Sequence, residues 1–352
     1  MSDGELCART LRITPETWWS VLAEYRAHVP PPLDNETPDE EIRRCLGALG
    51  SIYRRRDARA VRLPAAAPTA RCPGCRRSSA EGAVSVSATL LYGRCPRCGH
   101  GVRLGEGAAW NEAAVRQRHA GPDYFRKRDV EGAGYDGYDR EAAYREAKGA
   151  RLVERLRTLP PPEIKTLLEV GSGYGYTRVA AERAGIRTGG VDLNREACRE
   201  AAARYGLGTF EGTLAEALAA APPISPAPGR GTWDAVLYQF VLEHVVDPAH
   251  ELTLARQALR PGGWLVLSVP SMEAAEIEVF GPAYRSFRGD HLHLFTRASL
   301  EAMLGEAGFQ LHLCESGCNI HLFGEVLSPI ALAALYESGR GPDLFVVARR
   351  LP

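Results

Sequence analysis

Apolar and polar positions follow two alternating rhythms from residue 164 to the C-terminus. Short runs of branched and aliphatic residues, typical of buried strands, alternate with stretches whose apolar positions recur every three or four residues, typical of helices. The expected strands cover 166–170, a second run ending at 191–194, and then 207–213, 232–239, 259–270, 309–315 and 343–348. Strands that alternate with helices predict an α/β fold with a Rossmann-like, doubly wound and mostly parallel seven-stranded sheet.

The N-terminal 60 residues show a different, purely helical pattern. Thr14-Pro15 and Thr37-Pro38 each combine an N-cap residue with proline at the first helical position, and an apolar stripe follows each of them. We expect a helical hairpin that packs on the rest of the protein or on a second subunit, or else a docking element for a substrate or carrier protein. The run Leu63–Pro68 predicts a linker.

A glycine-rich turn joins the first strand to the first helix of the sheet. It contains Gly171, Gly173 and Gly175, which let the backbone approach a ligand where a Cβ atom would clash. The helix N-terminus behind the turn offers free N–H groups to a carboxylate or phosphate. Asp192 ends the next strand, where an acid can accept hydrogen bonds from both ribose hydroxyls. The turn therefore predicts a site for a cofactor that contains a nucleoside.

The composition narrows the classes of partner. Lys plus Arg and Asp plus Glu both number 43, so the net charge is zero, which argues against extensive binding of nucleic acid. No apolar run approaches the length of a membrane span, and we expect no signal peptide because no apolar run follows a basic start. Cysteines in Cys-x-x-Cys pairs indicate metal binding in a reducing compartment, so we expect a cytoplasmic protein.

Two Cys-x-x-Cys pairs lie nineteen residues apart, Cys72 with Cys75 and Cys95 with Cys98. This spacing predicts a tetrahedral site of four thiolates for Zn²⁺, and four protein ligands leave no open position, so the metal would be structural. Residues 84–92 suit the strands of a zinc ribbon. His100 lies just outside the expected coordination sphere, and iron in a rubredoxin-like site is the alternative.

Four domains are expected along the chain: a helical N-terminal segment (1–62), a zinc ribbon (70–105), lid or linker helices (106–160) and the sheet domain (161–352). The third of these contains a tyrosine-rich loop, 132–138, and a predicted helix at 140–159. The loop is a candidate lid or substrate wall, or its aromatic residues pack the ribbon against the sheet domain.

Several further motifs give the sheet domain a family resemblance. The glycines follow the spacing G-x-G-x-G two residues after Glu169, whereas a dinucleotide-binding turn favours G-x-G-x-x-G. The later segments Leu242–Pro248 (LEH-x-x-DP), Leu259–Gly263 (L-x-PGG) and His291–Thr296 (H-x-H-x-F-T) complete the pattern. Over roughly 165–316 the chain resembles class I S-adenosylmethionine-dependent methyltransferases of the ubiquinone-biosynthesis-like, small-molecule type.

The resemblance implies S-adenosyl-L-methionine as the cofactor and assigns residues to its parts. The acid of the motif contributes to holding the methionine end, and the glycines make room for it. The residue after Asp192 would flank the adenine, the loop tyrosines would cover the methionine moiety, and the end of the fourth strand would lie near the sulfonium. The expected cofactor residues are Glu169, Gly171, Gly173, Tyr174, Gly175, Tyr176, Asp192, Leu193, Thr213, Gln239 and Phe240.

A neutral oxygen or nitrogen acceptor must lose a proton, which requires a general base. The candidates are His291, next to Asp290, and His244 in the LEH motif, although the Glu-His pair of that motif also serves as scaffold on the cofactor side. His293 alternates with apolar residues and is expected to be packed. An acceptor that is already nucleophilic needs no base.

The favoured function is methyl transfer to a small-molecule acceptor, such as a natural product, a sugar or a related metabolite. The alternatives are an rRNA guanine methyltransferase whose ribbon binds RNA, a non-catalytic zinc-dependent scaffold, and an NAD-dependent oxidoreductase, which the glycine spacing disfavours. An insertion at 320–336 is a candidate for the acceptor pocket or for a homodimer contact.

Overall fold

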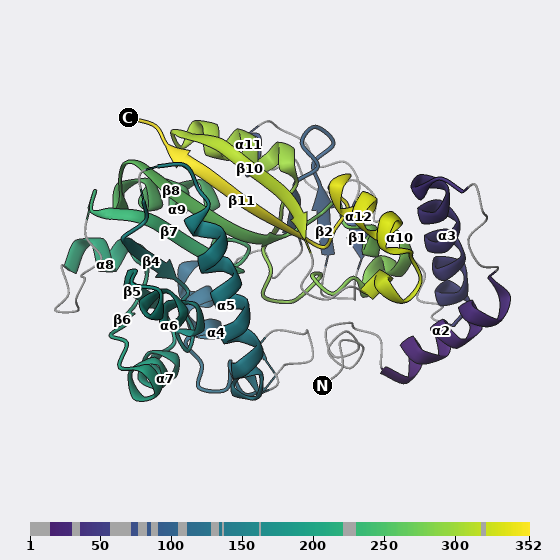
Figure 1. Cartoon of the computed structure of the whole chain (residues 1–352), viewed down its shortest axis with the longest axis horizontal. Coiled ribbons are helices and arrows are strands. Elements are labelled where there is room, and N and C mark those ends of the chain that lie inside the picture. The colour runs from purple at the N-terminus through teal and green to yellow at the C-terminus, as the bar shows by residue number, and fades with distance from the viewer. Residues whose placement is uncertain are drawn as a thin grey trace. The chain divides into compact units, whose positions relative to one another are not determined.

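The computed structural model describes most of the chain, and Figure 1 shows its helices and strands. The described residues are 15–29, 36–56, 72–76, 83–85, 91–104, 111–127, 134–135, 137–161, 163–220, 230–317 and 322–352. They belong to two compact units. The first unit comprises 1–108, 270–299 and 314–345, and the second comprises 109–269, 300–313 and 346–352. The predicted boundary at residue 160 thus falls inside the second unit, and the four predicted domains stay a prediction.

Seven strands, most of whose residues belong to the second unit, form one sheet, as predicted. Its strand order is β10-β11-β8-β7-β4-β5-β6, and the pairs β5–β6, β4–β5, β4–β7 and β7–β8 are parallel. Leu167 and Leu168 on the central strand are fully buried, which is the expected environment of a parallel strand covered on both faces. The strands are β4 (Thr166–Val170), β5 (Arg187–Asp192), β6 (Phe210–Glu211), β7 (Trp233–Gln239), β8 (Leu259–Pro270), β10 (Phe309–Gly317) and β11 (Asp343–Arg350).

The sequence supplies capping residues for several of the helices that precede and connect these strands. Asn111, Asn194 and Asp247 each accept a backbone N–H with the side chain, and proline follows Asp247 at the first helical position. The helices are α4 (Glu112–His119), η2 (Tyr138–Glu141), α5 (Ala142–Arg157), α6 (Tyr176–Arg183), α7 (Arg195–Tyr205), α8 (Leu214–Ala220), α9 (Pro248–Ala258) and α11 (Arg297–Glu306).

A small antiparallel sheet in the first unit contains the ribbon. Its order is β1-β2-β3-β9, from β1 (Ala83–Ser85), β2 (Leu91–Arg94), β3 (Gly101–Leu104) and β9 (His293–Leu294). The first three strands come from the predicted ribbon, and β9 comes from the H-x-H-x-F-T segment almost 200 residues later. The sheet thus joins two segments that the sequence assigned to separate domains.

The N-terminal helices pack within the first unit on the helices of the later insertions. The helix α3 contacts both α10 and α12, and Tyr53 meets Phe280 edge to face at 5.3 Å. The buried Glu41 accepts hydrogen bonds from the backbone N and the hydroxyl of Ser328, which itself caps α12. This packing agrees with the prediction of a hairpin that packs on the rest of the protein. The elements are α2 (Pro15–His28), α3 (Pro38–Arg56), α10 (Ala275–Phe280), η3 (Gly281–Ala283), η4 (Leu322–Glu325) and α12 (Pro329–Glu337).

Two predicted elements have different bounds in the structure, and two other predicted segments lie wholly or partly outside the described residues. The third strand of the sheet pairs only over Phe210–Glu211, not over 207–213, because Thr213 already caps α8. The predicted helix at 140–159 begins with a 3₁₀ turn and ends at Arg157. The expected linker at 63–68 and part of the tyrosine-rich loop lie outside the described residues.

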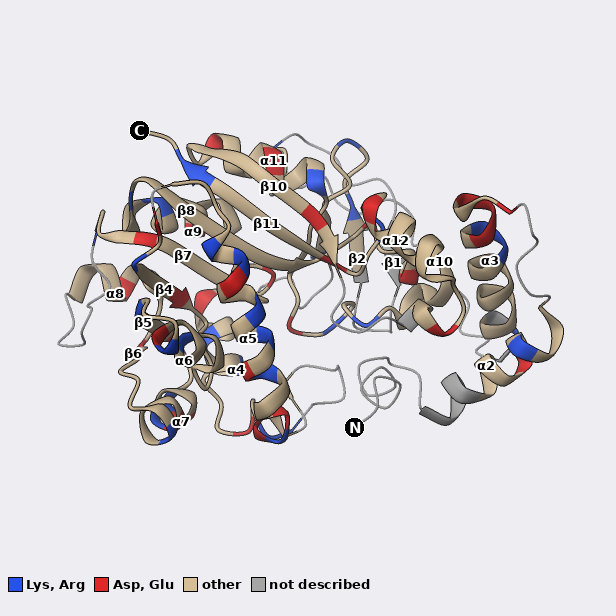
Figure 2. Cartoon of the chain, viewed as in Figure 1, with Lys and Arg blue, Asp and Glu red and all other residues tan. Residues whose placement is uncertain are grey.

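The described helices carry charged residues of both signs (Figure 2). Acidic and basic residues are interspersed along the described elements (Figure 2). None of the described helices has the length and apolar character needed to cross a bilayer.

Candidate active site

The glycine turn between β4 and α6 has a backbone shape that strongly favours glycine. Gly171, Gly173 and Gly175 all have positive φ, between 52° and 80°. A Cβ atom on Gly171 would lie 2.3 Å from the Val241 side chain, and one on Gly173 would lie 3.1 Å from the Tyr138 hydroxyl. The predicted order of strand, tight turn and helix is confirmed. Val241 and Tyr138, from two other segments of the second unit, pack closely against the turn.

Glu169 lies buried beneath this turn and keeps one oxygen available. Its Oε1 accepts a hydrogen bond of 2.9 Å from Nε2 of Gln239, which also donates to the Thr177 hydroxyl at 2.6 Å. Its Oε2 has no hydrogen-bond partner among the described residues. Burial raises the pKa of this carboxyl to about 7, although the bond from Gln239 opposes the shift. A buried carboxyl with an unfilled acceptor fits a cationic ligand group such as an ammonium.

Asp192 holds the glycine turn from the neighbouring strand. Its Oδ2 accepts the backbone N–H of Gly173 at 2.7 Å, and its Oδ1 accepts that of Asn194 at 2.8 Å. Burial raises its pKa to about 6, against these two hydrogen bonds. Each carboxylate oxygen has a second lone pair, so both can still accept a hydroxyl of a ribose. Leu193, the expected adenine neighbour, is half-buried beside it.

The register of the sheet explains why these acids meet. Val170 pairs with Val191 on one side and with Tyr238 on the other. The carboxyl ends of β4, β5 and β7 therefore lie together, and Glu169, Asp192 and Gln239 converge at the edge where ligands bind in open α/β sheets.

Aromatic side chains from the tyrosine-rich segment cover the tyrosines of the turn. Tyr138 contacts Tyr174 and Tyr176 with ring centroids 5.2 and 5.5 Å apart, and Phe125 lies 5.2 Å from Tyr174. The Arg145 guanidinium lies 3.8 Å above the Tyr138 ring. This cluster lies against the tyrosines expected to hold the methionine moiety, and its role as a lid stays a prediction.

The end of β7 carries backbone strain. Phe240 has φ of 56°, which is uncommon for a residue other than glycine and costs about 1–3 kcal/mol. Its backbone N–H bonds to the Ser268 carbonyl at 2.8 Å, and the Lys148 ammonium lies 4.9 Å from its ring centroid. Strain of this kind concentrates at functional sites. The place of Phe240 near the transferred group stays a prediction.

Thr213 has a structural task in addition to its predicted cofactor role. Its hydroxyl bonds to Glu216 Oε2 at 3.1 Å and accepts the backbone N–H of Glu216 at 3.2 Å. These bonds form a capping box at the start of α8. Cofactor binding by Thr213 stays a prediction.

His244, in the second unit, packs against a histidine that the sequence analysis missed. The ring centroids of His244 and His119 lie 4.7 Å apart, and Asn194 holds the backbone carbonyl of His119 at 2.8 Å. Because Asn194 follows Asp192 by two residues, this bond ties the end of α4 to the cofactor side. A single histidine at a helix end has no spacing signal that could have marked it.

His291, in the first unit, has a defined tautomer. Its Nδ1 lies 2.9 Å from the Ser286 carbonyl, which can only accept, so the neutral ring carries its proton on Nδ1 and its lone pair on Nε2. The neighbouring Asp290 is engaged by Arg288 through two hydrogen bonds of 3.0 Å. His293 contacts Nε2 of His100 at 3.2 Å, in the packed role that was predicted for it.

The four ribbon cysteines form one cluster. Sγ of Cys72 lies 3.5 Å from that of Cys98, Sγ of Cys75 lies 3.8 Å from that of Cys95, and all four sulfurs lie within 4.8 Å of one another. A tetrahedral site with Zn–S bonds of about 2.3 Å places the sulfurs about 3.8 Å apart. All four thiols are unbridged. The residues present therefore fit a zinc ion.

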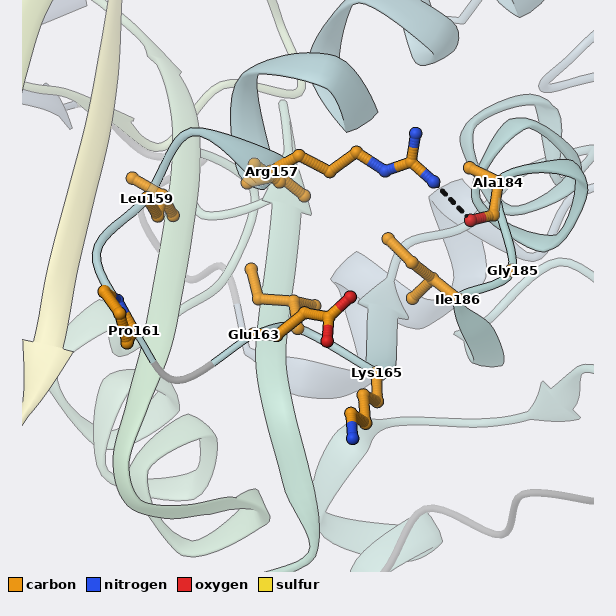
Figure 3. Close-up of a pocket in the computed structure, with 10 residues that line it drawn as sticks. Arg157, Leu159, Pro161, Glu163, Lys165, Ala184, Gly185 and Ile186 are labelled. Carbon is orange, nitrogen blue, oxygen red and sulfur yellow. Dashed lines mark hydrogen bonds between the residues drawn. The ribbon is translucent and has the colours of Figure 1, made fainter.

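A cavity of about 440 Å³ lies elsewhere in the second unit (Figure 3). Arg157 spans it and donates a hydrogen bond to the Ala184 carbonyl, and Lys165 immediately precedes β4. The cavity thus lies at the amino end of the central strand, opposite the glycine turn, and is not part of the cofactor site.

Comparison with known proteins assigns the family. A family model described as a methyltransferase domain matches residues 138–313, half of the chain. A ubiquinone biosynthesis O-methyltransferase of Thiobacillus denitrificans is 32% identical over 55% of this chain and 82% of its own length. One of Ralstonia nicotianae is 32% identical over 37% of this chain and 54% of its own length. The chain belongs to the methyltransferase domain family, and it is an S-adenosylmethionine-dependent methyltransferase related to these O-methyltransferases.

A solved S-adenosylmethionine-dependent methyltransferase of Thermotoga maritima is also similar. It is 20% identical to this chain, covers 60% of it and 94% of its own length, and superposes with a TM-score of 0.43.

Proposed function

We propose that the enzyme transfers a methyl group from S-adenosylmethionine to an oxygen of a small-molecule acceptor. The observation that carries the proposal is the buried Glu169, with one oxygen filled by Gln239 and the other unfilled, beside a turn that Asp192 holds. The relatives' names supply the expectation of an oxygen nucleophile, since both are O-methyltransferases.

Each expected cofactor residue would contact a different part of S-adenosylmethionine. Glu169 would receive the ammonium of the methionine moiety on its unfilled oxygen, and Asp192 would receive the two ribose hydroxyls. Leu193 would flank the adenine. Tyr174 and Tyr176, covered by the Tyr138 ring, would exclude water from the methionine end.

The transfer itself needs alignment more than covalent chemistry from the protein. S-adenosylmethionine supplies a methyl group on a positively charged sulfur, which leaves as a neutral thioether. Gln239 and the strained Phe240 lie at the strand end that would border this group. The acceptor oxygen must be held about 3 Å from the methyl carbon and in line with the sulfur.

His291 is the proposed general base for a hydroxyl acceptor. The hydrogen bond from its Nδ1 to the Ser286 carbonyl favours the tautomer whose lone pair is on Nε2, the form that can accept a proton. His244, packed on His119, is the second candidate.

The zinc ribbon is proposed to be structural. Cys72, Cys75, Cys95 and Cys98 would fill all four positions around the ion, so no position remains for a substrate or water. Unbridged thiols in this arrangement support a reducing, cytoplasmic location. The interspersed charges of the described elements favour a small acceptor over RNA (Figure 2).

Calorimetry with S-adenosylhomocysteine tests the proposal, with a matched pair of variants. Asp192→Asn keeps the shape of the side chain but removes the charge that would bind the ribose, and we expect affinity to fall about 10- to 100-fold. Asp234→Asn is the control, because Asp234 also accepts two backbone N–H groups, at 2.8 Å each, but at the opposite end of the sheet. Absence of binding to the wild type, or equal affinity in the two variants, would count decisively against the proposal.

A further inference from the structure

The ribbon is built into the segment that carries His291. Gly101 and Val102 on β3 pair with Leu294 and His293 on β9. The backbone N–H of Arg103 continues the ladder to the Leu292 carbonyl at 2.9 Å. These contacts lie within the first unit, so the ribbon strands and residues 286–294 form one structure.

A ribbon tyrosine fixes the backbone of the His291 loop. Tyr92 on β2 is fully buried, and its hydroxyl lies 2.8 Å from the Arg288 carbonyl and 2.7 Å from the His291 carbonyl. Its ring lies against Phe287, with centroids 4.9 Å apart. A phenol has one proton to donate, so the two carbonyl oxygens share it and are held close together.

The second ribbon residue is Arg103, which reaches the same loop from β3. One of its guanidinium nitrogens donates to the carbonyl of Gly289, between the two carbonyls that Tyr92 holds. Three carbonyls within four residues of the loop thus accept from ribbon side chains.

The shape of this loop determines the tautomer of His291. The Nδ1–H of His291 meets the Ser286 carbonyl only because the chain turns back within five residues, a turn that a bond of 3.3 Å from His291 N to the Arg288 carbonyl also stabilises. The Arg288 carbonyl is one of the two that Tyr92 holds. Loss of the Tyr92 hydroxyl would loosen this turn and the Nδ1–H bond with it.

We propose that Tyr92 and Arg103 are positioning residues, which hold the 286–292 loop so that His291 keeps its proton on Nδ1 and its lone pair on Nε2. The ribbon then has a task in the reaction besides stability. The inference rests on one part of the proposed function, namely that His291 is the general base.

The test compares Tyr92→Phe with Tyr284→Phe in the full-length zinc-loaded protein. Tyr284 is also fully buried in the first unit, and its hydroxyl also bonds two carbonyls, of Ser271 and Pro342, at 2.8 and 3.0 Å. Both variants lose one hydroxyl and keep the ring, so they should lose similar stability. Tyr92→Phe removes two bonds to carbonyls of the His291 loop, whereas Tyr284→Phe leaves both of these intact and, within the loop, loses only a contact with the Ser286 side chain.

Nitrogen NMR of histidine-labelled protein reports the tautomer, with the His291 signals assigned by their loss in His291→Asn. We expect a single Nδ1–H tautomer in the wild type and in Tyr284→Phe, and a mixture of tautomers in Tyr92→Phe. Hydrogen exchange of amides 287–292 should be at least about tenfold faster in Tyr92→Phe. Arg103→Lys should move the same signals in the same direction.

The inference is overturned if Tyr92→Phe and Tyr284→Phe give the same His291 tautomer and the same exchange rates. This outcome differs from failure of the proposed function. The proposed function would be contradicted if the wild type bound no S-adenosylhomocysteine, or if the His291→Asn variant methylated an acceptor as fast as the wild type. In either case the NMR comparison would still decide the role of Tyr92.

Discussion

At the scale of single residues, the site depends on two buried acids whose protonation is tied to ligand binding. Glu169 and Asp192 have pKa values raised to about 7 and about 6, in both cases mainly by burial. Without a ligand, both carboxyls are therefore partly protonated near pH 6.5. A cationic ammonium beside Glu169 favours the ionised form and lowers its pKa again.

Binding of S-adenosylhomocysteine near pH 6.5 should accordingly release protons. Calorimetry in two buffers of different ionisation enthalpy measures the number released, and Glu169→Gln should reduce it. Release should disappear above about pH 8, where both carboxyls are already ionised. No net proton exchange in the wild type at pH 6.5 would contradict the pairing of Glu169 with the ammonium.

The glycine turn gives a second prediction at this scale. Gly171 and Gly185 both have positive φ, but a Cβ atom would clash with Val241 at the first position and meet nothing within 4 Å at the second. Both alanine variants should lose about 1 kcal/mol of unfolding free energy from backbone strain. Gly171→Ala should lose more, and it alone should lose affinity for S-adenosylhomocysteine, as thermal melting with and without ligand can measure. If the two variants lost the same stability and the same affinity for S-adenosylhomocysteine, the glycine turn would not be part of the ligand site.

The residues that the sequence predicted best are those with a spacing signal. Glu169, the three glycines and Asp192 follow from the pattern of strand, turn and helix, and the sheet register brings them together as expected. His119 and Tyr92 carry no such signal, because their importance comes from a partner 125 and 199 residues away in the sequence. The spacing of Thr213 and Glu216 predicts the capping role of Thr213, whereas the family pattern predicts a cofactor role for it.

At the scale of elements, most helices and strands follow from the hydrophobic periodicity and the caps. The exceptions are elements whose pairing depends on distant partners. The strand β6 is only two residues long, and β9 exists because β3 lies beside it, which no local pattern shows. The sequence predicts that residues 291–296 belong to the sheet domain, whereas in the structure His293 and Leu294 form the fourth strand of the ribbon sheet.

The four-cysteine cluster gives the prediction at this scale. Purified protein should contain a single zinc ion by elemental analysis, and Cys72→Ser should lose most of it because three thiolates bind far more weakly. Cys198→Ser is the control, since Cys198 lies in α7, apart from the cluster. Metal-free wild type, or the same metal content in both variants, would contradict a zinc site.

At the scale of the whole molecule, the chain order and the structural units do not coincide. The first unit takes in 270–299 and 314–345 in addition to the N-terminal third. A sequence read in order assigns these stretches to the sheet domain, because their covalent neighbours belong to it. Within these stretches, β9 pairs with the ribbon, and α10 and α12 pack on α3 through tertiary contacts such as that of Glu41 with Ser328. The residues expected to bind the cofactor all belong to the second unit.

The most direct test of the central claim is a crystal structure of the protein with S-adenosylhomocysteine. The account predicts the ligand's ammonium within hydrogen-bond distance of Glu169 Oε2, its ribose hydroxyls on Asp192 and its sulfur near Gln239 and Phe240. A ligand bound away from the glycine turn, or bound there with its ribose away from Asp192, would contradict the account.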